Sequence, residues 1–521
     1  MKIFALKPGH DGTIAALDER KLLYSLESEK NSFPRFDRIT PTLLMEAASH
    51  LDGFPDVVAI SGWVKGWHSV EAKTEAGYFG CDENGIISGK RRFFGQEIDF
   101  FTSTHERSHL LCAYGMSPFP QGQPCYVLVW EGNLGDFYLI DENVKVKHIA
   151  RVLTDPGNKY SYLFFIGDPS FPNIKGHFRF GDAGKMMALG AFSDRKPADA
   201  DEQKLIDFLL AKDGIVHDVP KSDLTWSKFH NIGVESREFK NLAGKYSDAI
   251  FDRFYQFARQ NLKEGYPLLI AGGCGLNCEW NSKWHNSGLF QDVFVPPCTN
   301  DTGSAIGTAV DAQHYYTGNA KIEWSVYAGL PFVEDRDVNP DQFEIHALNL
   351  GQVAEYIEKG NIIGWNQGKY EIGPRALGNR SILASPFSAQ IMERLNVIKQ
   401  REAYRPIAPM VLEEDAADLF EGRTPSPYML YFQTLKTDRL QAITHVDNSA
   451  RIQSVAKADN PEMHAMLSAF KQHTGFGVLC NTSLNFKGKG FINQTSDMVA
   501  YCLKHGLDGF VIHDKFYIRK R

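Results

Sequence analysis

MKIFALKPGHDGTIAALDERKLLYSL, residues 1–26, contains three short apolar runs separated by two turns. Residues 1–6, 13–17 and 21–26 have the length and composition of β-strands, and the segments between them are rich in Gly, Pro and charged residues. Turns this short join strands that are neighbours in one sheet. The segment therefore predicts a β-meander that begins with a glycine-rich turn.

A second segment repeats this plan. Residues 126–140, YVLVWEGNLGDFYLI, form an apolar run, an acidic turn with two glycines and another apolar run. Two copies of one plan predict an internally duplicated α/β fold. Between residues 236 and 262 aromatic side chains recur at near-helical spacing, which predicts a long helix whose aromatic side chains pack in the core.

A change of character near residue 340 predicts a domain boundary. Residues 328–343, AGLPFVEDRDVNPDQF, mix Pro, Gly and acidic residues without the period of a helix or a strand. After this linker the pattern predicts a helix at 350–359 and a strand at 362–365. We therefore expect two domains, residues 1–340 and residues 341–521.

The composition is that of a folded globular protein. Of 521 residues, 43% are hydrophobic and 23% are charged, and the net charge is −7. A negative balance disfavours general binding to nucleic acid or to an anionic membrane. Eight cysteines without a CxxC pair predict reduced thiols, and the N-terminal sequence has no signal peptide or membrane span, so we expect a cytoplasmic protein.

Two histidines suggest a metal site. His105 and His109 are four residues apart, so on a helix they project from one face and can bind one ion. Asp301, in the CTNDTG turn before an expected helix at 304, can supply a third ligand, although an Asp in that position is also a common N-cap. The segment also reads HExxH, so a zinc hydrolase with Glu106 as the base is an alternative.

Glycine turns are candidates for binding phosphate or a nucleotide. The turn at 9–13 can present backbone N–H groups to a phosphate, with Asp11 holding a cation or a water and His10 serving as a general base, although such turns are usually simple hairpins. The further candidates are distributed over the same turn and three later segments; they are Gly12, Gly132, Gly135, Lys185, Gly273 and Asn277.

The last third of the chain carries cations set among Pro, Gly and apolar residues, unlike a solvated run of charge. They are Arg375, Arg380, Lys399, Arg401, Arg405 and Arg451. Arginine binds planar or tetrahedral anions through two hydrogen bonds, so the group predicts an anion site, with surface ion pairs as the alternative. The polar turn that begins at Asn481 is suited to binding a small polar group.

Seven segments in order resemble one family. They are HERSHLLCAYGMSPF (105–119), AGGCGLNCEWN (271–281), PPCTNDTGSAIG (296–307), GPRALGNRSILASP (373–386), LNVIKQREAYRPIAP (395–409), HVDNSARIQSV (445–455) and LCNTSLNFKGKG (479–490). Together with the GHDG turn they resemble the O-carbamoyltransferases of nodulation-factor and antibiotic tailoring. The length and the KPGHDG opening are most similar to members that carbamoylate 3'-hydroxymethylcephems.

The resemblance implies an α/β fold, with a duplicated actin-like ATPase (ASKHA) domain followed by a YrdC-like domain. Carbamoyl phosphate and ATP, with Mg²⁺ as a candidate cofactor of ATP, would give carbamoyl-adenylate, which transfers its carbamoyl group to a small hydroxylated acceptor. The implied roles are Fe²⁺ or another divalent metal at His105, His109 and Asp301, the base at His10, and phosphate binding at Arg375, Lys399, Arg405, Arg451 and Asn481.

Lys30 falls near a basic position of the family, where SLESEKNSFPR stands in place of the usual EERFTRKK. Acceptor choice is expected to depend on loops such as 63–78 and 155–177. A phosphotransferase of the actin-like superfamily is an alternative enzyme, because phosphate-binding turns and duplication occur there too. An RNA-binding protein that uses the YrdC-like half is disfavoured by the negative net charge.

Overall fold

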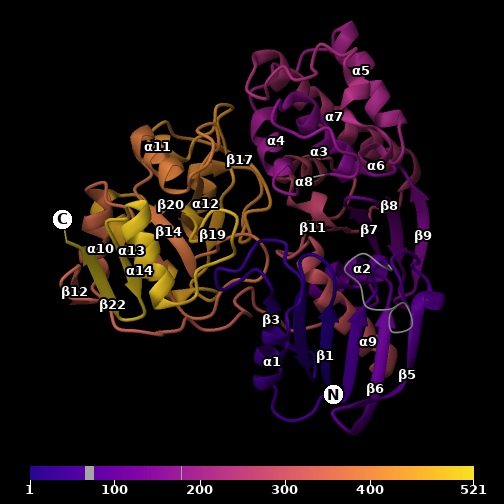
Figure 1. Cartoon of the computed structure of the whole chain (residues 1–521), viewed down its shortest axis with the longest axis horizontal. Coiled ribbons are helices and arrows are strands. Elements are labelled where there is room, and N and C mark those ends of the chain that lie inside the picture. Colours follow the sequence, from indigo (N-terminus) through magenta and orange to yellow (C-terminus); the bar gives the residue numbers. More distant parts are fainter. Residues whose placement is uncertain (65–75, 178, 521) are drawn as a thin grey trace. The chain divides into compact units, whose positions relative to one another are not determined.

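The computed structural model describes residues 1–64, 76–177 and 179–520 (Figure 1). Contacts between residues group the chain into two compact units. The first unit holds residues 1–121, 296–444 and 449–521, and the second holds 122–295 and 445–448. The boundary expected near residue 340 lies inside the first unit, and as a domain division it stays a prediction.

The N-terminal sheet of the first unit has six strands in the order β3-β2-β1-β4-β6-β5. Its strands are β1 (Lys2–Lys7), β2 (Thr13–Asp18), β3 (Lys21–Glu27), β4 (Val57–Ser61), β5 (Ile86–Phe93) and β6 (Gln96–Ser103). The first three form the predicted antiparallel meander, while β4 is parallel to β1 and β6 is parallel to β4.

The sheet of the second unit has five strands in the order β11-β10-β7-β8-β9. They are β7 (Cys125–Trp130), β8 (Gly135–Ile140), β9 (Val146–Arg151), β10 (Leu268–Ala271) and β11 (Val293–Phe294). As in the N-terminal sheet, a three-stranded antiparallel meander is followed by two strands parallel to its first strand. The shared topology agrees with the duplication that the sequence predicts.

Several helices of the second unit pack against one another. They are α3 (Pro156–Gly167), α4 (Asp182–Gly190), α5 (Ala200–Ala211), α6 (Ile215–Asp218), α7 (Arg237–Asn261) and α8 (Cys278–Asn286). The helix α7 confirms the prediction for residues 236–262, with Ser236 as its N-cap. Its Phe254 is buried against the ring of Trp130, which in turn stacks on Trp280.

Two helices of the first unit carry most of the candidate metal site. The helix α2 (His105–Met116) packs against α9 (Ser304–Thr317), and α9 also lies on β1, β2 and β4 (Figure 1). A Cβ atom at Gly307 of α9 would come within 1.7 Å of the Ser108 carbonyl oxygen, so glycine is what allows the two backbones to meet. A further helix of this region is α1 (Pro41–Ser49).

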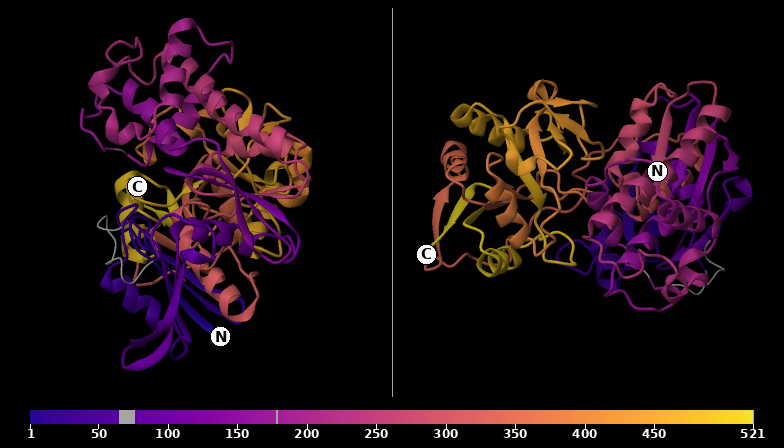
Figure 2. Two further views of the ribbon diagram at one scale, coloured as in Figure 1. Left: turned by 90° about the vertical axis from the view of Figure 1, so that its right-hand side faces the viewer. Right: turned by 90° about the horizontal axis from the view of Figure 1, so that it is seen from above.

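The C-terminal part of the first unit is built on an eight-stranded mixed sheet of order β12-β22-β21-β13-β14-β20-β15-β19, and beside it lies a three-stranded sheet, β16-β17-β18. The strands are β12 (Phe343–Ala347), β13 (Ile363–Asn366), β14 (Arg380–Ala384), β15 (Ala408–Leu412), β16 (Phe420–Glu421), β17 (Gln433–Leu435), β18 (Ser449–Ala450), β19 (Gln453–Val455), β20 (Val478–Ser483), β21 (Gly509–Ile512) and β22 (Lys515–Arg519). The helices are α10 (Leu350–Glu358), α11 (Ala389–Ile398), α12 (Glu413–Leu419), α13 (Pro461–Thr474) and α14 (Thr495–His505), shown from two further sides in Figure 2.

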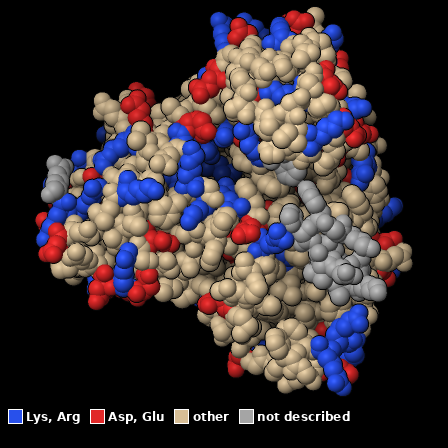
Figure 3. Space-filling view, in the orientation of Figure 1, with Lys and Arg blue, Asp and Glu red and all other residues tan. Residues whose placement is uncertain are grey.

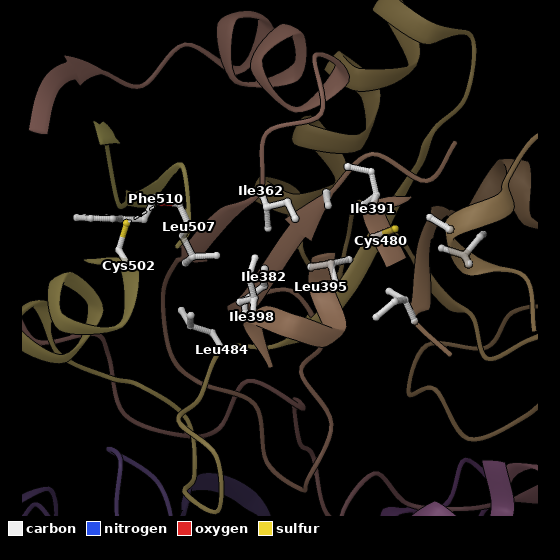
Figure 4. Packing of buried hydrophobic residues seen from close by; sticks show 14 of the residues in the cluster. Ile362, Ile382, Ile391, Leu395, Ile398, Cys480, Leu484, Cys502, Leu507 and Phe510 are labelled. Atoms are coloured by element: carbon white, nitrogen blue, oxygen red, sulfur yellow. Dashed lines mark hydrogen bonds between the residues drawn. The ribbon is translucent and has the colours of Figure 1, made fainter. Parts of the chain in front are cut away.

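The core of this part confirms the predicted restart of regular structure after the linker. Figure 4 shows Ile362, Ile382 and Leu395 packed together, all fully buried. Residues 328–343 have no helix, as expected, but Phe332 and Val338 are buried in the same cluster. The linker is therefore packed onto the C-terminal part instead of standing in solvent.

A short backbone pairing joins the two ends of the first unit. Pro34 forms an antiparallel bridge with Lys489, Arg35 N–H donates to the Gly488 carbonyl at 3.0 Å, and Gly490 N–H donates to the Phe33 carbonyl at 2.9 Å. The segment after β3 is thereby fixed to the turn that follows β20.

Two expectations from composition can be compared with the structure. All eight cysteines are described residues, and none of them forms a disulfide. Among the described residues no helix combines the length and the apolar composition that crossing a membrane requires. Basic and acidic side chains both occur on the face shown in Figure 3.

Candidate functional site

The helix α2 begins at the first of the two candidate histidines. Its N-cap is Thr104, whose hydroxyl accepts a hydrogen bond from Arg107 N–H at 3.1 Å, so the helical spacing applies from His105 onward. His105 and His109 are almost completely buried, and their Nε2 atoms are 3.1 Å apart. The predicted pair therefore presents two ring nitrogens to one point.

Asp301 approaches this pair from the turn before α9. Its Oδ1 atom is 3.4 Å from His109 Nε2 and 3.6 Å from His105 Nε2. The alternative that Asp301 is an N-cap is wrong, because it begins a short 3₁₀ turn, Asp301–Gly303, and the N-cap of α9 is Gly303. The carboxylate faces the histidines because a buried charge needs polar partners that offset its loss of hydration.

The three groups fit a metal ion. Their ligand atoms all lie within 4.8 Å of one another, and all three side chains are buried. Two imidazoles and one carboxylate suit Fe²⁺, Zn²⁺ or Mn²⁺, so this donor set does not select one of them. The structure brings the predicted ligands together, and their role in binding metal stays a prediction.

Lys7, at the end of β1, also contacts Asp301 and was not found from the sequence. Its ammonium is 3.0 Å from Asp301 Oδ2, donates to the His10 carbonyl, and lies 4.0 Å from the centre of the Trp63 ring. The side chain is fully buried. A lone lysine in a strand looks like a surface residue, and its position directly before the glycine turn was the available signal.

His10 and Asp11 form a pair in the predicted turn. His10 Nδ1 is 2.7 Å from Asp11 Oδ2, which assigns Nδ1–H as the donor in the neutral ring and leaves Nε2 as the basic nitrogen. That Nε2 atom is 3.7 Å from Asp301 Oδ2. Asp11 thus orients the predicted base, whereas the sequence predicted that Asp11 holds a cation or a water.

The charges around Asp301 keep it ionised. Burial would raise the pKa of this carboxyl, but Lys7, His105 and His10, with a hydrogen bond from His109, hold the pKa well below its usual value. An anionic carboxylate is the form that binds a metal ion.

Gly12 and Lys30 are occupied by contacts within the protein. Gly12 N–H donates to the Asp37 carbonyl at 2.8 Å. The Lys30 ammonium is buried, donates to the Gly373 carbonyl at 2.7 Å, and is 3.2 Å from Glu27 Oε2. Both residues therefore have structural partners, and their predicted phosphate contacts stay predictions.

The predicted cations of the C-terminal part lie close enough to repel one another. Burial, then Arg405 and Arg451, lower the pKa of Arg401 to about 9. Burial and the same kind of repulsion, from Arg401, Arg405 and Arg35, hold the pKa of Lys399 well below its ordinary value. Cations that destabilise one another in a folded protein are typical of a site for an anion.

In this cation cluster (Arg35, Lys399, Arg401, Arg405 and Arg451), Lys399 donates to the Asn485 side chain at 2.7 Å and Arg401 donates to the Asn396 side chain at 2.6 Å. Among the described residues, the buried Arg451 Nε atom has no hydrogen-bond partner. The sequence missed Arg35, which comes from the N-terminal segment that pairs with residues 488–490.

Asn481 contacts the backbone next to Arg375. Asn481 Nδ2 donates to the carbonyl of Ala376, the neighbour of Arg375, at 2.8 Å. The Asn481 amide is thereby held in place by backbone next to Arg375. Arg380 differs from the other predicted cations, because its guanidinium is fully buried and hydrogen-bonds to Asn493, Gln367 and Gly368.

The remaining candidates belong to the second unit. The turns that hold Gly132 and Gly273 follow the parallel strands β7 and β10, whose carboxyl ends lie at one edge of the sheet. Ligands commonly bind at such an edge. The two turns are in contact, since Cys274 Sγ is 3.9 Å from the Glu131 carbonyl oxygen.

Three of these candidates have clear structural partners. The Asn277 side chain caps α8 by accepting from the backbone N–H groups of Glu279 and Trp280. Gly135 allows a close approach, because a Cβ atom there would lie 2.4 Å from the Leu153 carbonyl oxygen. Lys185 Nζ is 3.1 Å from Asp182 Oδ1. Their nucleotide contacts stay predictions.

Two further expectations concern Glu106 and the acceptor loops. Glu106 Oε2 accepts a hydrogen bond from the Gly80 N–H at 2.9 Å, so this carboxylate has a structural role at the start of α2. Of the loop at 63–78, residues 65–75 lie outside the described residues. The segment 155–177, expected to be a loop, contains α3.

Comparisons with known proteins match the whole chain. A family model described as the carbamoyltransferase N-terminus matches residues 86–310, and one described as the carbamoyltransferase C-terminus matches residues 354–520. The 3'-hydroxymethylcephem-O-carbamoyltransferases of Amycolatopsis lactamdurans and Streptomyces clavuligerus are 48% and 47% identical, each over 100% of this chain and 99% of their own. Nodulation protein U of Bradyrhizobium diazoefficiens is 30% identical over 96% of this chain and 94% of its own.

Solved structures match only weakly. The activator of the 2-hydroxyisocaproyl-CoA dehydratase from Clostridium difficile has a TM-score of 0.34 and 10% identity, and it covers 61% of this chain and 98% of its own.

Proposed function

This chain belongs to the carbamoyltransferase family, and from that premise we propose that it transfers a carbamoyl group to the hydroxyl of a 3'-hydroxymethylcephem. The observation that carries the acceptor class is the identity of 48% and 47% with two proteins of that name over the full length. The relatives called nodulation protein U match less closely. The chain is an enzyme, and the acceptor is the proposed part.

We propose further that the carbamoyl group is activated as carbamoyl-adenylate. Carbamoyl phosphate, ATP and water would give carbamoyl-adenylate, phosphate and pyrophosphate, and both starting molecules are anions. The cation cluster supports this step, because clustered arginines bind phosphate groups and stabilise charge that develops on them. An actin-like fold of the duplicated sheets and a YrdC-like fold of the C-terminal part belong to the same proposal.

Transfer to the alcohol needs a base, because a neutral hydroxyl is a weak nucleophile. The oxygen of the acceptor would attack the carbamoyl carbon, AMP would leave, and the hydroxyl proton would pass to His10 Nε2. The contact between His10 Nδ1 and Asp11 Oδ2 supports this role, since it orients the ring with Nδ1–H as the donor and Nε2 as the acceptor. A divalent metal held by His105, His109 and Asp301 would polarise the carbonyl.

The test is incubation of the enzyme with carbamoyl phosphate, ATP and a 3'-hydroxymethylcephem, followed by mass spectrometry of the acceptor. We expect the mass gain of one carbamoyl group, and none when either co-substrate is omitted. Product formed without ATP would refute the adenylate. Labelled phosphate appearing on the acceptor would instead support the phosphotransferase alternative. Membership of the carbamoyltransferase family disfavours both this alternative and the zinc hydrolase.

A further inference from the structure

The Asp301 carboxylate contacts both the Lys7 ammonium and the two histidines of the candidate metal site. Asp301 Oδ2 is 3.0 Å from Lys7 Nζ, while Oδ1 faces the two histidines at 3.4 and 3.6 Å. One oxygen of the carboxylate is thus engaged by a fixed cation, and the other points to the place where the ring nitrogens converge.

Lys7 cannot easily leave this position. Its side chain is fully buried, its ammonium also donates to the His10 carbonyl, and the Trp63 ring lies over it at 4.0 Å. The neighbouring backbone is shaped for the same packing, because a Cβ atom at Gly9 would come within 2.6 Å of Trp63, and Gly9 has φ of +88°. The ammonium group is therefore fixed in this position.

Resting on the metal site of the proposed function, we propose that Lys7 is a positioning residue that competes with the bound metal for Asp301. The ammonium restricts Asp301 to one-oxygen coordination and withdraws part of its negative charge. A metal that receives less charge from its ligands is bound less tightly and polarises a carbonyl more strongly. Through the His10 carbonyl the same ammonium fixes the backbone of the base.

Lys7 should change metal affinity in the direction opposite to that of most groups that contact a metal ligand. Such groups usually accept a hydrogen bond from a ligating histidine and make it a better donor, so their removal weakens metal binding by about 10–100-fold. Lys7 donates to the ligand and repels a second cation. Removing its charge should therefore strengthen metal binding, whereas the loss of a purely structural contact should weaken it.

The experiment measures metal affinity without turnover. Co²⁺ is titrated into the full-length protein against a coloured chelator, and the cobalt absorption spectrum reports the coordination number. We expect Lys7→Met to bind Co²⁺ about tenfold or more tightly, with a spectrum shifted toward higher coordination as Asp301 gains a second bonding oxygen. Lys7→Gln keeps a hydrogen-bond donor without charge and should also bind more tightly, so it replaces Lys7→Met if that variant does not fold.

A matched control is Lys90→Met. Lys90 also pairs with an aspartate, Asp99 at 2.9 Å, but its side chain is 59% exposed, so Co²⁺ affinity should not change. Unchanged or weaker binding by folded Lys7 variants would overturn the proposal while leaving the metal site intact. Absence of Co²⁺ binding by the unmodified protein would overturn both this proposal and the metal part of the proposed function.

Discussion

The buried ion pair between α2 and α9 makes Asp311→Leu a severe perturbation. Arg107 lies on α2 between the two candidate metal ligands, and it donates to Asp311 of α9 from Nε at 2.8 Å and from Nη2 at 2.6 Å. Asp311 is 1% exposed and Arg107 is 5% exposed. Removing the carboxylate leaves a guanidinium in the interior without its counter-charge.

The expected cost follows from that burial. Breaking a buried pair by removing one partner costs about 3–5 kcal/mol, which is a large share of the 5–15 kcal/mol that stabilises a typical domain. Replacing both partners by apolar residues removes the uncompensated charge, so Arg107→Met combined with Asp311→Leu should be less destabilised than Asp311→Leu alone. Because α2 carries His105 and His109, the single variant should also bind metal less tightly.

Urea unfolding followed by tryptophan fluorescence measures these differences. The control is Glu355→Gln, which removes an exposed pair with Lys359 and should leave the unfolding curve unchanged. If Asp311→Leu unfolds at the same urea concentration as this control, or if the double variant is no more stable than the single one, the reasoning from burial is refuted.

Three further predictions concern the reaction, the helix contact and the cation cluster. His10→Asn should lower transfer to the alcohol by about 10²–10⁴-fold in a mass-spectrometric assay, while pyrophosphate release from ATP and carbamoyl phosphate persists; normal transfer would remove His10 as the base. Gly307→Ala should destabilise the protein by about 1–3 kcal/mol or more in urea, because its Cβ meets a backbone carbonyl of α2, whereas Gly181→Ala, with open space around it, should not; equal effects would contradict the close contact. Burial and repulsion lower the pKa of Arg401 to about 9, so above that pH the unfolded chain binds more protons than the folded protein does. The ligand-free protein is therefore destabilised by the charged Arg401 below pH 9, and this destabilisation decreases as the pH rises above 9. Inorganic phosphate at one fixed concentration, a hundred times its dissociation constant at pH 7, should therefore stabilise the protein by about 2.7 kcal/mol at pH 7 and by less at pH 10. Thermal unfolding measures both values, and equal stabilisation at the two pH values would count against the cluster as an anion site.

Local patterns predicted what depends on neighbouring residues in the sequence. Apolar runs bounded by turns gave the strands β1–β3, β7 and β8, and aromatic spacing gave α7. The four-residue spacing of His105 and His109 was sufficient to place both rings on one helix face. In each case a few consecutive residues determine the geometry.

Local sequence patterns did not predict contacts between residues that are far apart in the chain. The contact of Lys7 with Asp301 joins positions nearly 300 residues apart, and nothing in either segment distinguishes this lysine from an exposed one. Arg35 reaches the cation cluster only because its segment pairs with residues 488–490. Asn277 shows the converse, because a motif residue expected to contact a nucleotide uses its side chain oxygen to cap a helix.

The pairing of Pro34 with Lys489 has a consequence for the order of events on the ribosome. The two residues are 455 positions apart in the chain. At a synthesis rate of about 5–20 residues per second, the segment after β3 waits roughly 20–90 seconds for its partner to be made. During that interval the segment after β3 lacks these backbone partners, so a segment that is synthesised early in this enzyme is among the last to be finished.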